Sequence, residues 1–123
     1  MATQRKPQPT LQPPAHAPAP WKCKAETYWL LFHLRKPLPA GIYDPLEASH
    51  PACSTDSFAG SLGMIHIVRY SDTPVGSYDE LAIIPGVFKA PGGSEKGKVR
   101  MRVSRIYVNQ KETCWNGESP HCL

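Results

Sequence analysis

The sequence predicts a mainly β fold with little helix, behind a disordered proline-rich tail. Three observations favour this fold class. Bulky aromatic and β-branched residues gather in short runs, whose length suits strands better than helices. Apolar and basic residues alternate with the period of a strand over residues 99–103. Prolines and glycines, 14 and 9 among 123 residues, separate these runs.

The first 20 residues have a composition of their own. They contain six of the prolines, and they lack both the apolar core of a secretory signal and a pattern compatible with an amphipathic targeting helix. We therefore expect a disordered tail over residues 1–20 and a cytoplasmic protein. No run approaches the ~18 apolar residues of a membrane-spanning helix, so we expect no membrane partner.

The first expected strand covers residues 27–34, a run of aromatic and aliphatic side chains that ends at closely spaced prolines. A short helix is the competing interpretation of this run. Beyond it, several prolines together with Gly41 and Asp44 predict a winding connection over residues 38–56. One helical turn is expected around residues 46–49.

Two further strands are expected in the middle of the chain. Residues 63–70 are rich in β-branched side chains and lack helix caps. Residues 71–77 contain an aspartate, a proline and a glycine that predict a loop, and residues 78–84 resume an extended pattern. The short loop predicts that these two strands are antiparallel neighbours.

The last expected strand follows an exposed turn at residues 91–94. Its apolar residues alternate with basic ones, and the alternation changes phase near Ser104 and Arg105. A β-bulge at this point would produce such a change. Together these elements predict a curved, mostly antiparallel sheet.

The four cysteines are widely spaced and include no C-x-x-C pair, which favours reduced thiols over a disulfide framework. They are Cys23, Cys53, Cys114 and Cys122. Cys114, Cys122 and His121 could be considered as metal ligands, but a fourth ligand at zinc-site spacing is lacking. We therefore expect neither a metal nor another cofactor.

The net charge of +4 is unevenly distributed. Seven lysine or arginine residues and a single acid, Glu95, lie between Lys89 and Lys111. Only Phe88 and Tyr107 are nearby aromatic residues, so the interleaved pattern of a nucleic-acid surface is missing. We expect a solvated strand face and no nucleic-acid partner.

Five segments together resemble one known family. They are residues 26–29, 43–47, 63–70, 72–81 and 105–108, and the most specific piece is the pattern Gly76-x-Tyr78-x-Glu80. Over residues 21–117 their order and spacing are similar to the acetoacetate decarboxylase family. The closest likeness is to the decarboxylase-like proteins of filamentous fungi.

This resemblance implies an antiparallel β-barrel or cone with an interior pocket. It also implies lyase activity, in which a buried lysine forms a Schiff base with a small β-keto acid and carbon dioxide is lost. Glu80 would then be the catalytic carboxylate that orients the keto acid or moves a proton. The substrate pocket would include Tyr78, Glu26, Trp29 and His66, although Glu26 stands where the decarboxylases proper carry an arginine.

The resemblance stops before the family's reactive lysine, because residues 118–123 diverge. The remaining candidates in this region, Lys89, Lys96, Lys98 and Lys111, are expected to be solvated and therefore protonated. We thus expect a tail over residues 1–20, a partial domain over residues 21–117 and a divergent end. Such a chain would be the N-terminal half of a decarboxylase-like barrel, and inactive.

Each candidate site residue also has a structural interpretation. Glu80 could pair with an arginine on a strand face, and His66 could line a surface or pocket without a catalytic task. Trp29 and Tyr78 could be core aromatic residues.

A non-catalytic function is the alternative for the whole chain. It would be a binding or interaction protein that uses the basic strand of residues 99–108 and an open sheet edge. Four strands are too few to close a barrel, and unpaired strand edges invite pairing with another chain. Self-association through these edges is therefore expected.

Overall fold

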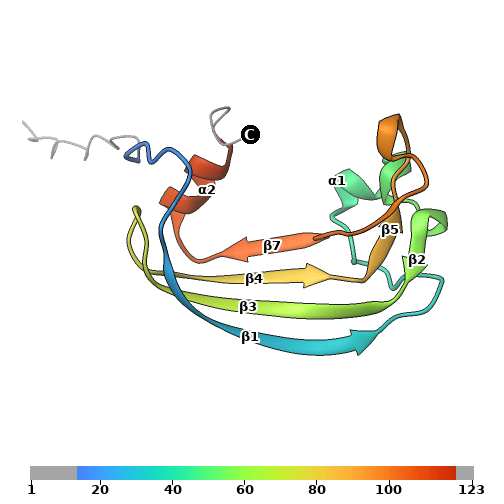
Figure 1. Ribbon diagram of the computed structural model, residues 1–123, viewed down its shortest axis with the longest axis horizontal. Helices are drawn as coiled ribbons and strands as arrows, with labels where there is room; N and C mark the ends of the chain where they lie inside the picture. Colours follow the sequence, from blue (N-terminus) through green and yellow to red (C-terminus); the bar gives the residue numbers. More distant parts are fainter. Residues whose placement is uncertain (1–13, 119–123) are drawn as a thin grey trace, which may run out of the picture.

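The computed structural model describes residues 14–118, which form two antiparallel sheets (Figure 1). The larger sheet has the strand order β1-β3-β4-β7, and the smaller one has the order β2-β5-β6. The strands are β1 (Lys24–His33), β2 (Phe58–Gly60), β3 (Leu62–Asp72), β4 (Tyr78–Ile84), β5 (Val87–Lys89), β6 (Val99–Met101) and β7 (Arg105–Val108). The described helices are α1 (Pro45–Ala48), α2 (Lys111–Glu118) and the 3₁₀ turns Pro51–Cys53, Thr55–Ser57 and Gly93–Glu95.

The mainly β prediction is confirmed, as are its three longest elements. Strand β4 has the predicted bounds and β3 extends beyond its own at both ends, whereas β1 begins three residues earlier and ends one residue earlier than predicted. It is a strand rather than the competing short helix. The expected helical turn is α1, where the Asp44 carboxylate accepts a hydrogen bond from the Leu46 N–H at 3.0 Å. Such capping satisfies a backbone donor that a helix start leaves unpaired.

The loop between β3 and β4 is held by its own side chains. The Thr73 hydroxyl donates to the Gly76 carbonyl at 2.6 Å and accepts from the Val75 N–H at 3.2 Å. Gly76 has a φ of 92°, which a side chain would disfavour. The loop therefore fixes the antiparallel register in which Tyr70 faces Tyr78.

The prediction of one bulged strand over residues 99–108 is wrong. Strands β6 and β7 belong to different sheets, and the chain crosses between them at residues 102–104. The Ser104 N–H donates to the Ile83 carbonyl at 2.8 Å at this crossing. The change of phase in the sequence thus marks a change of sheet.

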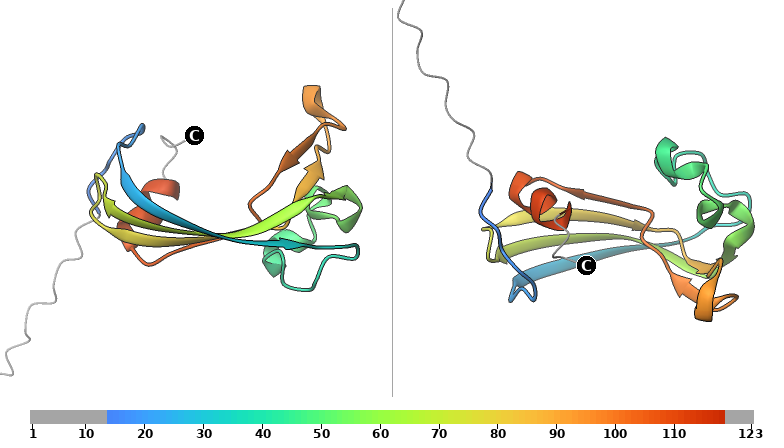
Figure 2. Two further views of the ribbon diagram at one scale, coloured as in Figure 1. Left: turned by 60° about the horizontal axis from the view of Figure 1, so that its bottom comes forward. Right: turned by 90° about the horizontal axis from the view of Figure 1, so that it is seen from above.

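The barrel or cone expected from the family resemblance is not confirmed. Within residues 14–118 the larger sheet is open, with β1 at one edge and β7 at the other. Its two ends curve toward the side on which α2 lies (Figure 2). The sheet therefore has an inner face on the side of α2 and an outer face on the opposite side.

The strand registers assign each side chain to one face, because directly opposed residues share a face and successive residues alternate. The inner face carries Thr27, Trp29, Leu31, Met64, His66, Val68, Tyr70, Tyr78, Glu80, Ala82, Ile84, Ile106 and Val108. The outer face carries Glu26, Tyr28, Leu30, Phe32, Ile65, Ile67, Arg69, Asp79, Leu81, Ile83, Arg105 and Tyr107.

The tightest aromatic packing lies beside the smaller sheet, at the end of the larger sheet away from α2 (Figure 1). Phe58 and Phe88 are each 1% exposed, their ring centroids are 5.2 Å apart, and Tyr43 packs against Phe88. The Arg102 guanidinium lies 4.7 Å from the Phe88 ring centroid, a cation–π contact. This cluster anchors the winding connection of residues 38–56.

Helix α2 is tied to the start of the described chain through Asn116, which is 1% exposed. Its side chain accepts from the Ala17 N–H at 2.8 Å and donates to the carbonyls of Ala15 and Glu112. Of the tail expected over residues 1–20, residues 1–13 lie outside the described part, as do residues 119–123 of the expected divergent end. Neither α1 nor α2 is long and apolar enough to span a membrane.

Candidate functional site on the inner face

The inner face brings four of the five predicted site residues onto one surface. Trp29 comes from β1, His66 from β3, and Tyr78 and Glu80 come from β4. Trp29 is directly opposite His66, and Glu80 is directly opposite Val68, two residues further along β3. Since diagonal neighbours on one sheet face approach within reach of long side chains, His66 and Glu80 are adjacent.

His66 is held between apolar neighbours. Its ring meets the Trp29 ring edge-on, with centroids 5.8 Å apart and an interplanar angle of 78°. Its Nε2 atom is buried and has no hydrogen-bond partner among the described residues. Because buried polar atoms are nearly always paired, this unpaired ring nitrogen is unusual. It is inaccessible to solvent, so a bound molecule would reach it only if the side chains that cover it moved aside.

Glu80 lies in a similarly apolar setting. Burial raises the pKa of its carboxyl group above the ordinary value, and the nearby His66 opposes part of this rise. Val68 and Ala82 beside it are each 3% exposed. Within the described residues its carboxylate makes no ion pair with an arginine, so the structural interpretation of a surface pair does not hold there.

Tyr78 closes the end of the inner face that lies beneath α2. Its ring stacks on Tyr70 with centroids 4.5 Å apart and an interplanar angle of 28°. Burial, with smaller contributions from Tyr70 and Glu80, raises the pKa of the Tyr78 hydroxyl to about 12, and a hydrogen bond with Thr113 of α2 acts in the opposite direction. Tyr78 is therefore a packed aromatic residue that stays protonated at neutral pH.

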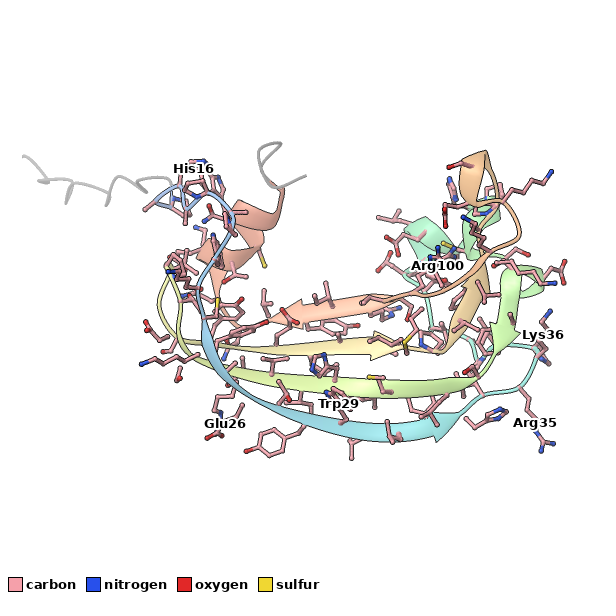
Figure 3. All side chains as sticks on the ribbon, viewed as in Figure 1. His16, Glu26, Trp29, Arg35, Lys36 and Arg100 are labelled. Atoms are coloured by element: carbon pink, nitrogen blue, oxygen red, sulfur yellow. The ribbon has the colours of Figure 1, made fainter. Side chains whose placement is uncertain are left out.

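The structure does not bring Glu26 together with the other four residues. It lies on the outer face, opposite Arg69 in the register of β1 and β3, and its carboxylate accepts from the Tyr28 hydroxyl at 3.1 Å. Figure 3 shows the Glu26 side chain directed away from the sheet at the outer side of β1. Its neighbour three residues along, Trp29, faces inward because strand residues alternate.

The outer face has an open hollow of about 580 Å³ across its four strands. Apolar atoms form most of its surface, and among its polar residues Arg69, Asp79 and Asn109 interact with one another, while Glu80 also borders it. Arg69 and Asp79 form an ion pair at 3.2 Å, and the Asn109 side chain bonds both the backbone and the carboxylate of Asp79. The outer hollow therefore differs from the inner face in that Arg69, Asp79 and Asn109 are already engaged with one another.

The basic residues of the expected binding strand hold neighbouring segments of the chain. Glu95 pairs with Lys98 at 2.8 Å and with Arg100 at 2.6 Å. The Arg105 guanidinium donates to the carbonyls of Gly41 at 2.8 Å and Tyr43 at 3.0 Å. These basic side chains therefore hold parts of the chain together. The spacing of lysine and arginine residues in the sequence does not show these contacts.

Two residues that the sequence did not single out, Arg105 and Asn116, fix the surroundings of the site. Arg105 fastens the loop at Gly41 to the edge strand β7, and Asn116 holds α2 against residues 15–17. Their signal in the sequence is weak, because their partners are backbone groups more than 60 residues away. Only the folded topology brings them together.

The described cysteines Cys23, Cys53 and Cys114 are free thiols, and Cys122 lies outside the described residues together with His121. Residues 14–118 contain no group of three or more side chains arranged to hold a metal ion.

Comparison with known proteins finds two similar plant proteins, both named "Protein NEOXANTHIN-DEFICIENT 1". The protein from Oryza sativa subsp. japonica is 31% identical over 98 residues, which cover 80% of this chain and 29% of that protein. The protein from Arabidopsis thaliana is 29% identical over 102 residues, covering 83% of this chain and 33% of that protein. The chain therefore spans about a third of the length of these curated relatives.

No family model matches the chain, and no solved structure matches it.

These findings overturn the assignment to the acetoacetate decarboxylase family. The relatives are plant proteins that carry the name NEOXANTHIN-DEFICIENT 1, not fungal decarboxylase-like proteins. Two predictions that depended on this assignment are therefore also wrong. They are the lyase activity on a β-keto acid and the interpretation of the chain as an inactive decarboxylase fragment. The quoted motifs lie at β-turns and strands, where the demands of turn geometry and sheet packing alone favour similar residues.

Proposed function

We propose that this chain is a binding module whose inner sheet face holds an apolar molecule bearing hydroxyl groups, the chemical class of neoxanthin. The observation that carries the proposal is the pair His66 and Glu80 on an otherwise apolar face. Ligand sites typically combine apolar walls with a few polar groups that fix orientation. The inner face has this composition, with His66 and Glu80 among apolar neighbours, whereas Arg69, Asp79 and Asn109 of the outer hollow pair with each other.

The polar pair suits a hydroxyl group in particular. A hydroxyl has one proton to donate and two lone pairs to accept with, so it can pair with a ring nitrogen and a carboxyl group at once. When the side chains that cover it move aside, the Nε2 atom of His66 would gain the hydrogen-bond partner that it lacks among the described residues. Trp29, 60% exposed beside it, would lie against the hydrocarbon part of the ligand.

The name of the relatives supports the ligand class. It refers to a deficiency in neoxanthin, which is a xanthophyll, a long polyene hydrocarbon with hydroxyl groups. An extended curved sheet suits a long ligand better than a small charged keto acid. Because the chain corresponds to about a third of those proteins, our proposal concerns binding by this module and no reaction step.

The proposal is tested by titrating the purified chain with neoxanthin and with β-carotene, a hydrocarbon that lacks the hydroxyl groups. Co-elution in gel filtration and a shift of the polyene absorption band would report binding. We expect neoxanthin to bind at least about tenfold more tightly, the effect of one hydrogen bond to a buried polar group. His66→Leu should remove this preference.

A matched pair of variants identifies the face that binds. Trp29→Ala and Tyr28→Ala change neighbouring aromatic residues of similar exposure, 60% and 56%, on opposite faces of β1. We expect Trp29→Ala to weaken neoxanthin binding and Tyr28→Ala to leave it unchanged, with circular dichroism confirming that both variants fold. Absence of neoxanthin binding, or equal losses in the two variants, would overturn the proposal.

A further inference from the structure

Strand β1 forms one edge of the larger sheet and is unusually open to pairing. It pairs with β3 along its full length of ten residues, and no strand among residues 14–118 pairs with its other side. The outward backbone donors and acceptors of such an edge form a template for another strand. Any partner would extend the sheet beside the inner face without covering it.

Edges of natural sheets usually carry features that prevent pairing, such as charges, prolines, bulges or short strands. The part of β1 from Thr27 to Phe32 has none of them: it contains no charge, proline or glycine, and the one register irregularity lies before it, between Lys24 and Ala25. Segments of this composition have the strongest tendency to pair with copies of themselves.

The opposite edge of the same sheet is protected. Strand β7 has only four residues and begins with Arg105, whose guanidinium fastens the loop at Gly41 and Tyr43 beside it. Helix α2 follows β7 closely in the chain. The β7 edge thus offers a partner strand a much shorter template than the β1 edge, which favours an assembly of two chains through β1.

Large apolar side chains on both faces of β1 are exposed to solvent, and a partner strand would cover part of their surface. Tyr28, Trp29, Leu30 and Leu31 are between 56% and 60% exposed. Two of them lie on each face, so a second strand laid along β1 would shield apolar surface on both sides of the sheet. Burial of such surface favours association.

The charges at the two ends of β1 indicate which partner fits. Glu26 lies near its start, after Lys24, whereas His33, Arg35 and Lys36 lie at its end. In Figure 3 the labelled Glu26 lies toward one end of the strand and Arg35 and Lys36 lie beyond the other. A second copy running antiparallel would bring Glu26 of each chain to the basic end of its partner, an attraction that Lys24 beside it partly opposes, whereas a parallel copy would set every one of these charges against its like.

We propose that β1 pairs antiparallel with β1 of a second copy of this chain, forming a two-fold symmetric dimer with one continuous sheet. This interface is separate from the inner face, so the dimer does not depend on the proposed ligand. A two-fold pairing of the β1 edge closes at two chains, because each chain has then used that edge of its larger sheet.

Analytical ultracentrifugation of the purified chain over a wide concentration range tests this proposal. We expect a reversible monomer–dimer equilibrium. Leu30→Lys places a charge on strand β1 at the proposed interface. It should raise the dissociation constant of the dimer at least about tenfold, because each chain then contributes a lysine and the two like charges repel each other. Tyr107→Lys is the matched control, because Tyr107 is 51% exposed on the outer face of β7, as Leu30 is 58% exposed on the outer face of β1; it should leave the equilibrium unchanged.

Hydrogen exchange at high and low protein concentration gives a second measurement that does not require a variant. Amides of residues 27–32 should be more protected at high concentration, and those of β7 should not change. A chain that is monomeric at all concentrations, an equal effect of the two lysine variants, or growth beyond a dimer that Leu30→Lys does not prevent would each overturn the proposal. Ligand binding by monomeric protein would leave the proposed function intact.

Discussion

At the scale of single residues, the inner face derives its chemistry from where the backbone puts two polar side chains. His66 and Glu80 are ordinary strand residues in sequence, separated by a loop and carried by neighbouring strands. The register of β3 and β4 makes them adjacent, and the curvature of the sheet surrounds them with apolar neighbours. A carboxyl group in such surroundings resists ionisation because its charged form loses hydration.

The raised pKa of Glu80 predicts how its charge affects stability. The folded protein binds the carboxyl proton more tightly than the unfolded chain does, so stability falls as pH rises from the ordinary value of 4.5 through the raised value. Glu80→Gln removes this cost. We expect a higher unfolding midpoint than the native chain at neutral pH, and no difference below pH 4.5, measured by thermal unfolding at several pH values.

The neighbouring carboxylate provides the control for this measurement. Asp79 lies on the outer face and is paired with Arg69, so Asp79→Asn should give no gain in midpoint at neutral pH. A Glu80→Gln variant that is less stable than the native chain at neutral pH would contradict the stated origin of the pKa shift.

At the scale of elements, the long strands could be predicted and the short ones could not. Strands β1, β3 and β4 have seven or more residues, enough for composition and flanking turn residues to indicate them. Strands β2 and β5 have three residues each, and their existence depends on pairing with each other. The residues near each short strand in the sequence do not indicate this pairing, because the two strands are far apart in the chain.

The same contrast explains the candidate site. Alternation along a strand places His66 and Glu80 on defined faces once the register is known, but the register itself depends on the loop around Gly76. The family resemblance placed Glu26 in the same pocket as Trp29. They lie on opposite faces because their separation of three residues is odd.

Strand β3 also contains a glycine that the packing requires. A Cβ atom on Gly63 would lie 2.5 Å from Cε2 of Phe32 and 2.7 Å from the carbonyl oxygen of Pro85. Gly63→Ala should therefore lower the free energy of unfolding by about 1–3 kcal/mol, the usual cost of overpacking. Chemical denaturation measures this change.

Gly92→Ala is the matched substitution, because a Cβ atom there would have no neighbour within 4 Å and its backbone is extended, with a φ of −167°. Its effect should stay within about 0.5 kcal/mol. Equal costs at the two glycines would contradict the close approach of Phe32 and Pro85 to β3.

At the scale of the whole molecule, the tightest packing and the candidate site lie in different places. The fully buried aromatic rings gather beside the smaller sheet, whereas many side chains on both faces of the larger sheet remain partly exposed. The packed end holds the connection between β1 and β3, and the open sheet is left available for binding. Stability and binding should therefore respond to different substitutions.

Phe58→Ala tests this division. Phe58 is 1% exposed and in contact with Phe88, so its truncation should cost about 3–5 kcal/mol and abolish or greatly lower the cooperative unfolding transition. Leu46→Ala, at a residue that is 91% exposed, should leave the thermal midpoint unchanged. A mild effect of Phe58→Ala would show that the aromatic cluster is not the main source of stability.

The contact of Asn116 with Ala17 has a consequence for how the protein is made. The two residues are 99 positions apart, so their hydrogen bond cannot form until nearly all of the described chain has left the ribosome. Strands β1, β3 and β4 can pair earlier, during synthesis, while residues 15–17 still lack their partner. During synthesis, attachment of α2 to residues 15–17 therefore follows the emergence of all four strands of the larger sheet.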